Sequence, residues 1–66
     1  MMNNKIGKKI MKLRLKMNLS QRQLAERVGV SASAIAMYEA NERVPRDEVK
    51  VRLAHFFDTS VQSLFF

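Results

Sequence analysis

The stretch Ser-Gln-Arg-Gln-Leu-Ala-Glu-Arg-Val-Gly-Val-Ser-Ala-Ser-Ala-Ile-Ala-Met-Tyr-Glu, residues 20–39, predicts two short helices joined by a tight turn. Ser20 and Gln23 have the spacing of a capping box, in which each side chain bonds the backbone amide of the other residue. Ser31 is placed to cap the second helix. Gly29 stops the first helix where the backbone turns left-handed and a side chain would be opposed. We therefore expect helices over 21–28 and 32–40.

Apolar residues recur at helical spacing along one side of both helices, which predicts that this side faces a core. They are Leu24, Ala25, Val28, Ile35 and Tyr38. The other side of the second helix carries small or flexible residues, which we expect to face outward. They are Ala32, Ser33, Ala36 and Met37.

A helix over 5–17 is expected before this pair. Its apolar stripe has the spacing of one helical face and consists of Ile6, Ile10, Leu13 and Met17. Asn18 follows at a position that suits a left-handed cap, because its short side chain tolerates positive φ.

Two more helices are expected after the pair, over 46–57 and 60–65. Pro45 fits the first turn of the longer one, and Asp47 and Glu48 suit its positive dipole end. Its apolar stripe is Val49, Leu53, Phe56 and Phe57. Thr59 and Gln62 have the spacing of another capping box, followed by the apolar residues Val61, Leu64 and Phe65. The sequence thus predicts an all-α domain of five helices over residues 1–66.

Composition narrows the classes of function. The chain has no cysteine and one histidine, so we expect no disulfide, no metal site and no cofactor. No arrangement of nucleophile and base or of paired carboxylates is evident, which argues against an enzyme. No apolar run is long enough to cross a bilayer, so no membrane contact is expected. The lack of cysteine is compatible with a cytoplasmic location.

The net charge of +6 lies entirely in the first segment. Residues 1–16 hold six basic residues and no acidic one, whereas residues 17–66 hold six of each. The six are Lys5, Lys8, Lys9, Lys12, Arg14 and Lys16. Such a one-sided field attracts polyanions. The alternative is a solvated helix face that aids solubility.

The whole pattern resembles the Cro/C1-type helix-turn-helix family, also called XRE-like regulators. The matching residues span nearly all of the chain: Leu13-Arg14, Leu19-Ser20-Gln21, Leu24-Ala25, Val28-Gly29-Val30-Ser31, Ile35, Tyr38-Glu39, Pro45, Leu53-Ala54, Phe57, Ser60-Val61 and Leu64. The resemblance implies a lambda-repressor-like fold whose third helix enters the major groove of double-stranded DNA. Asn18 and Asn41 stand where the family usually has glycine.

The resemblance also implies roles for single residues. Gln21, Asn41 and Arg43 are expected to bind DNA phosphates. Arg14 and Glu39 are expected to form an ion pair that braces the third helix, with Arg14 also reaching a phosphate. The alternative for Gln21 is a plain surface residue, for Arg43 a solvated loop charge, and for Arg14 and Glu39 two unrelated surface charges.

Base reading would fall to the outward residues of the third helix, Ala32, Ser33, Ala36 and Met37. The family often places larger polar residues there, so direct readout is expected to be modest. Alanine and methionine can contact thymine methyl groups, and serine can bond several base edges. A smooth surface of this kind can also meet a protein.

The C-terminal third holds more apolar surface than a small core needs, which predicts a homodimer interface. Its expected residues are Val51, Phe56, Val61, Phe65 and Phe66. The alternative is that Phe65 belongs to the core. The leading hypothesis is a prokaryotic or phage transcriptional regulator, a repressor that binds a palindromic operator. The alternative is an antitoxin-like or accessory subunit whose protein partner docks on the aromatic C-terminus.

Overall fold

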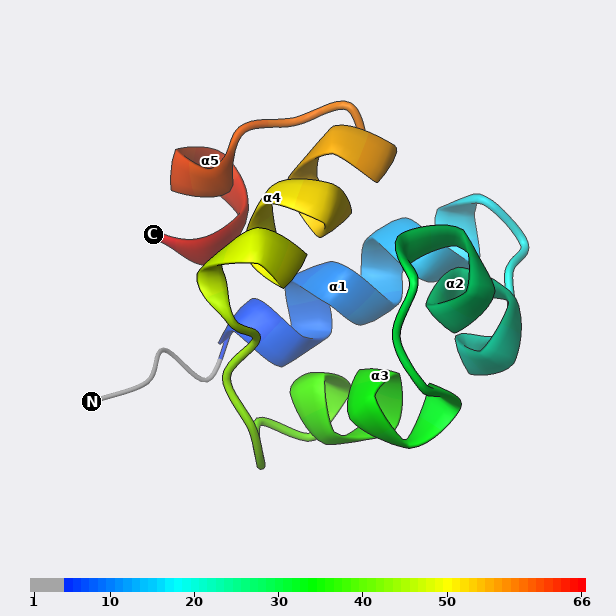
Figure 1. Cartoon of the computed structure of the whole chain (residues 1–66). Helices are drawn as coiled ribbons and strands as arrows, with labels where there is room; N and C mark the ends of the chain where they lie inside the picture. Colours follow the sequence, from blue (N-terminus) through cyan, green and yellow to red (C-terminus); the bar gives the residue numbers. More distant parts are fainter. Residues whose placement is uncertain (1–4) are drawn as a thin grey trace.

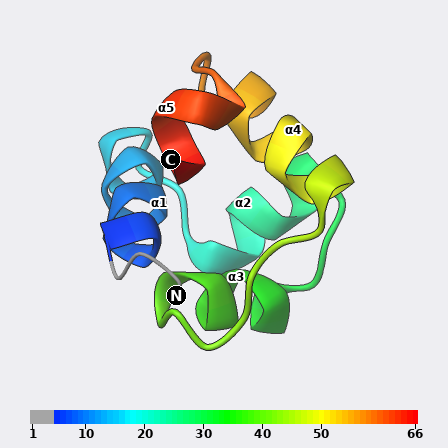
Figure 2. The same cartoon turned by 90° about the vertical axis from the view of Figure 1, so that its left-hand side faces the viewer.

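A computed structural model describes residues 5–66, which form helices joined by loops (Figure 1). The helices are α1 (Lys5–Lys16), α2 (Gln21–Val28), α3 (Ala32–Glu39), α4 (Asp47–Phe56) and α5 (Val61–Phe65). α2 packs on α3, α1 contacts α3 and α5, and α4 contacts α2 and α5. Viewed as in Figure 2, helices α1, α3, α4 and α5 surround the centre of the domain. The prediction of an all-α, five-helix domain is confirmed.

Each helix contributes one large, fully buried side chain to the same core. These residues are Ile10, Leu24, Ile35, Leu53 and Leu64. Burial of an aliphatic side chain of this size stabilises a fold by roughly 1.5–3 kcal/mol. Since the chain has no cysteine, this shared core holds the five helices together without disulfides.

The turn between α2 and α3 forms as the sequence predicts. The Ser20 hydroxyl accepts a hydrogen bond from the Gln23 amide at 3.0 Å, and the Gln23 side chain accepts one from the Ser20 amide at 2.8 Å. Gly29 has φ 73°, and Ser31 caps α3 by accepting from the Ala34 amide at 3.0 Å. This local geometry fixes where α3 begins.

The two asparagines that replace family glycines keep the left-handed conformation, with φ 56° at Asn18 and 59° at Asn41. Asp58 also adopts it, with φ 55°, which the sequence analysis did not anticipate. Each of these residues ends or follows a helix, so short polar side chains provide the turns that glycine would otherwise provide.

Three local predictions are wrong. Met17 lies beyond α1 and is 46% exposed, because the chain already turns there with its amide bonded to the Arg14 carbonyl. Pro45 is buried but precedes α4, whose N-cap is Arg46. The Thr59–Gln62 capping box does not form. Ser60 caps α5 by accepting from the Ser63 amide, while the Thr59 amide bonds the Ala54 carbonyl.

Candidate nucleic-acid interface

The outer face of α3 is left partly uncovered by the rest of the chain. Ala32 and Ser33 are exposed, whereas Ala36 and Met37 are half-buried. The inner face is closed, because Ala34, Ile35 and Tyr38 are buried in the core. The four residues that the sequence assigned to base contacts therefore lie together on one helix, opposite its core-facing side.

A buried ion pair fixes the end of α3 against α1. The Arg14 Nε donates to Glu39 Oε2 at 2.7 Å, and Nη2 donates to Oε1 at 3.0 Å. The two side chains are only 11% and 5% exposed. Such a two-pronged contact uses the planar fork of arginine and sets orientation as well as distance.

The same guanidinium also holds the turn that leads into α2. Its Nη1 donates to the Leu19 carbonyl at 2.8 Å. Arg14 thus donates to three oxygen atoms, two of Glu39 and one of Leu19, and the residue is only 9% exposed. Three of the five N–H groups of Arg14 donate inside the protein, and the expected phosphate contact by Arg14 stays a prediction.

The hydrogen bond to Glu39 raises the pKa of the Arg14 guanidinium above its ordinary value, and the charge of Glu39 adds to the increase. Burial acts in the opposite direction. The folded pKa is higher than the unfolded one, so the stabilisation by Arg14 is complete below the unfolded value. It is lost only as pH rises through the folded value.

Gln21, the first residue of α2, joins this network. Its Nε2 donates to Glu39 Oε1 at 3.0 Å, and the residue is half-buried. Glu39 therefore connects Arg14 of α1 with Gln21 of α2 while belonging to α3. We call Arg14, Glu39 and Gln21 the brace. Sequence reasoning paired Arg14 with Glu39 but missed the bond from Gln21.

A second contact between α1 and the end of α3 involves the main chain. The Gly7 amide donates to Asn41 Oδ1 at 3.1 Å. A Cβ on Gly7 would overlap the Glu39 carbonyl oxygen and lie 2.8 Å from its carbon. Sequence reasoning missed Gly7; a glycine inside a helix is costly, and that cost was the available signal. Asn41, expected to bind phosphate, uses its Oδ1 to hold α1.

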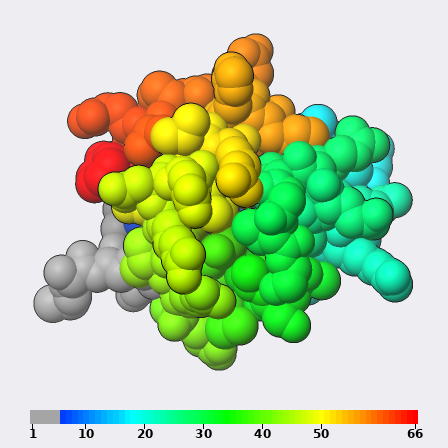
Figure 3. All heavy atoms as spheres, in the orientation of Figure 1, coloured from blue at the N-terminus to red at the C-terminus, as the bar shows by residue number. Residues whose placement is uncertain are grey.

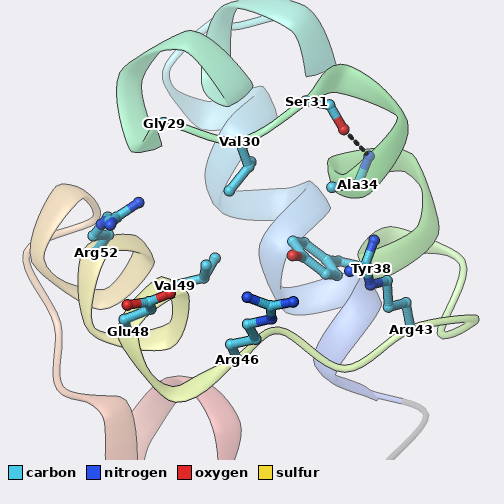
Figure 4. Close-up of a pocket in the computed structure, with 10 residues that line it drawn as sticks. All are labelled: Gly29, Val30, Ser31, Ala34, Tyr38, Arg43, Arg46, Glu48, Val49 and Arg52. Atoms are coloured by element: carbon cyan, nitrogen blue, oxygen red, sulfur yellow. Dashed lines mark hydrogen bonds between the residues drawn. The ribbon is translucent and has the colours of Figure 1, made fainter.

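Arg43 is exposed in the loop between α3 and α4. Together with Arg46 and Arg52 it borders a hollow of about 280 Å³ between α3, this loop and α4 (Figure 4). In the space-filling view of Figure 3, the yellow-green loop and the start of α4 adjoin the green α3. Sequence reasoning selected Arg43 alone, because the three arginines come together only in the fold.

The basic segment forms α1. Lys8, Lys12 and Lys16 are exposed, and Lys9 is half-buried, with its Nζ donating to the Ser63 carbonyl at 3.2 Å. Lys9 therefore also ties α1 to α5. The remaining exposed lysines contribute a positive field along one helix, as the charge distribution of the sequence predicts.

The C-terminal residues divide between core and surface. Phe65 is only 4% exposed, so its assignment to a dimer interface is wrong; its ring completes the protein's own core. Val51 and Phe66 are exposed by 55% and 75%, and Phe56 and Val61 are half-buried. Lys50 Nζ lies 5.6 Å from the centre of the Phe65 ring and 5.5 Å from that of Phe66.

Comparison with known proteins connects this geometry to a family. A helix-turn-helix family model matches residues 10–64. The P22 c2 repressor, solved in complex with the synthetic operator 9T, is 32% identical, with a TM-score of 0.87 and 91% of each chain covered. A solution structure of the P22 c2 DNA-binding domain is also 32% identical, with a TM-score of 0.82, covering 89% of this chain and 78% of that one.

The N-terminal DNA-binding domain of SinR from Bacillus subtilis is 28% identical, with a TM-score of 0.87, covering 97% of this chain and 94% of that domain. No curated protein sequence matches. The chain belongs to the Cro/C1-type helix-turn-helix family, whose members bind DNA and are not enzymes, and it is related to phage repressors and SinR. Among the described helices, none is long and apolar enough to span a membrane.

Proposed function

We propose that this protein is a sequence-specific transcriptional regulator that represses by binding a palindromic operator in double-stranded DNA as a homodimer. The observation that carries the proposal is the partly uncovered outer face of α3, which the brace ties to α1 and α2. The relation to the P22 c2 repressor, whose operator complex is known, supports it. In this proposal α3 lies in the major groove of each half-site.

The phosphate contacts come from groups around α3. Gln21 lies at the start of α2, where free backbone amides and the positive dipole end attract an anion. Its amide nitrogen carries two hydrogens and gives one to Glu39, so the other is available to a phosphate oxygen. Arg43 and Asn41 in the following loop contact the neighbouring backbone.

Base contacts come from Ala32, Ser33, Ala36 and Met37, none of which makes a bidentate bond. Alanine and methionine favour thymine methyl groups, and Ser33 bonds a base edge directly or through water. Direct readout by each subunit is therefore modest. Operator preference depends also on half-site spacing and on DNA shape.

The decisive experiment selects DNA fragments bound by the purified protein and footprints the selected sites. Affinity for a selected site should fall steeply as salt rises, because binding releases counterions. Protection of two half-sites about one helical turn apart supports a dimer. Binding that shows no preference among fragments would contradict the proposal.

Two substitutions separate the expected roles. Gln21→Ala should weaken all sites alike, because phosphate contacts carry no sequence information. Met37→Ala should change the order of preference among sites, because its side chain touches bases. Competition binding against a panel of sites measures both. An equal loss on every sequence for Met37→Ala would show that the reading face is placed wrongly.

A second function has one observation in its favour, the exposure of Val51 and Phe66. An antitoxin-like or accessory subunit would use this surface for a protein partner. Such a subunit, tested alone, would bind DNA weakly and without preference. In either role the protein would act in the cytoplasm, where prokaryotic or phage DNA is accessible.

A further inference from the structure

The lysines of α1 lie on the side of the helix that faces away from α3. α1 is tied to the end of α3 through Gly7 and Arg14. Lys9 and Lys16 each come two residues after one of these contacts, so they lie about 200° further round the helix. Lys12 lies about 140° from Gly7 by the same count. Figure 2 shows α1 between α3 and α5, so this basic side is turned toward α5 and solvent.

A hollow of about 250 Å³ opens on this side of α1, between α1 and α5. Its lining consists of Lys9, Lys12, Leu13, Thr59, Ser63 and Leu64. Leu13 is half-buried, and the stem of a lysine side chain is hydrocarbon up to the ammonium group. The accessible surface of the hollow is therefore mostly apolar, although positive charges stand at its edge.

The size of this hollow argues for a macromolecular partner. Pockets that enclose a small molecule usually have roughly 300–1,000 Å³, and this one is smaller. It suits a single large apolar side chain that belongs to a larger partner. The sugars and phosphates of a DNA duplex offer no such side chain, so the apolar lining favours a protein over a nucleic acid.

The charges beside the hollow favour an acidic partner. Neither α1 nor α5 contains an acidic residue. Lys12 and Lys16 are exposed, and among residues 5–66 neither forms an ion pair. Lys9 Nζ donates one hydrogen to the Ser63 carbonyl at 3.2 Å, which leaves two of its three donors for another acceptor.

We propose that α1 and α5 form a docking groove for an acidic amphipathic helix of a partner protein. An apolar side chain of that helix fills the hollow. Its carboxylates, at i, i+3 and i+4 spacing, lie beside Lys9, Lys12 and Lys16, which follow one another at the same spacing. The groove is turned away from α3, so DNA and the partner can bind together. The inference goes beyond the proposed function and does not depend on it.

The probe is a fluorescein-labelled peptide of about four helical turns, with one leucine flanked by glutamates at i, i+3 and i+4 spacing. One control peptide has serine for the leucine, and another has glutamine for the glutamates. Fluorescence anisotropy should show saturable binding of the probe and binding about tenfold weaker for each control. Absence of probe binding would overturn the groove. Equal binding of the serine peptide would reduce it to general attraction between charges and also overturn it.

Charge variants test the lysines of the groove. The double variant Lys12→Gln with Lys16→Gln should raise the Kd of the probe about tenfold, since each exposed ion pair contributes up to about 1 kcal/mol. Arg22→Gln with Arg27→Gln is the matched control, because it removes the same charge from exposed residues of α2. An equal loss in both double variants would contradict the proposed site.

A filling variant tests the hollow. Ser63→Phe places a large side chain there and should raise the Kd of the probe about tenfold or more, because the leucine can no longer be buried. Gln62→Phe, exposed on α5 outside the lining, is the matched control. Thermal unfolding checks that both variants fold, and Thr59→Phe fills the same hollow should Ser63→Phe fail to fold. Unchanged probe binding in a folded filling variant would refute the proposal.

Other occupants of the groove would give different results. Displacement of the probe by a non-operator DNA duplex, with the Lys12→Gln and Lys16→Gln variant losing that duplex, would assign the groove to nucleic acid and overturn the protein partner. Self-association that Ser63→Phe abolishes in sedimentation equilibrium would assign it to a second copy of the chain, with the same consequence. Failure of the protein to bind any operator would refute the proposed function and leave the peptide titration unchanged.

Discussion

At the scale of single residues, the brace depends most closely on the identity of its side chains. Glu39 accepts from both Arg14 and Gln21 inside the protein, so its carboxylate is needed to balance a buried cation and to position an amide. An ion pair of this kind adds little net stability compared with an apolar pair. Its value lies in holding three helices at defined angles.

Glu39→Ala should destabilise the domain by roughly 3–5 kcal/mol, because it leaves Arg14 buried without its partner. The double variant Arg14→Met with Glu39→Leu should cost clearly less than the sum of the single changes. Chemical denaturation of the original protein, Arg14→Met, Glu39→Leu and the double variant measures this coupling. Additive losses would show that the two side chains do not act as a pair.

Gly7→Ala should be more damaging than an alanine substitution on an exposed helix position. The new Cβ would meet main-chain atoms of Glu39, which cannot move aside as a flexible side chain can. We expect a loss of about 2 kcal/mol or more, in the range of overpacking. Lys12→Ala, on the exposed face of α1, is the control and should leave the unfolding midpoint nearly unchanged.

At the scale of elements, each predicted helix is present because its signal is local. The Ser20–Gln23 box, Gly29 and Ser31 act within a few residues, and the apolar stripes reflect one helical period. Contacts between distant residues could not be read in the same way. The bond from Gln21 to Glu39, the approach of Gly7 to Glu39 and the gathering of three arginines depend on how the helices cross.

The N-cap of α5 shows that capping-box spacing alone does not determine where a helix begins. Thr59 and Gln62 have capping-box spacing, yet Ser60 is the cap, because the Thr59 amide is already bonded to Ala54. Pro45 was misplaced for a related reason. Proline suits the first turn of a helix, but the loop before α4 uses it two residues earlier, as a buried side chain.

Ser60→Ala should therefore cost about 1 kcal/mol of unfolding free energy, the usual value of an N-cap. Thr59→Ala removes the competing hydroxyl and should cost less. Thermal or urea unfolding of the two variants compares them directly. A larger loss for Thr59→Ala would place the cap one residue earlier than the structure has it.

At the scale of the whole molecule, the basic α1 and the apolar residues Val51 and Phe66 serve different parts of the proposed function. The lysines of α1 supply a field that speeds encounter with DNA, an effect that weakens with salt. Exposed apolar residues favour association between protein chains. A dimer would double the number of helices that contact bases. This would compensate for the weak base discrimination expected of each single α3.

Phe66→Ser should weaken self-association and leave the fold intact, because the side chain is 75% exposed. Sedimentation equilibrium measures the first effect and thermal unfolding the second. Leu15→Ser is the matched control, since Leu15 is 55% exposed but lies on α1. If Leu15→Ser and Phe66→Ser lower association equally, the contact is not specific to the C-terminal surface.

Where α1 crosses the end of α3, peptide backbone lies directly against peptide backbone at Gly7. Backbone atoms, unlike side chains, cannot change rotamer to accommodate a displacement. We therefore expect this contact between α1 and α3 to be rigid. We therefore expect a force on α1, whether from a fused sequence or from a neighbouring molecule, to change the tilt of α3. If the proposed function holds, we expect a sequence fused ahead of α1 to alter operator affinity without touching a single base, which competition binding of the fused and original proteins measures.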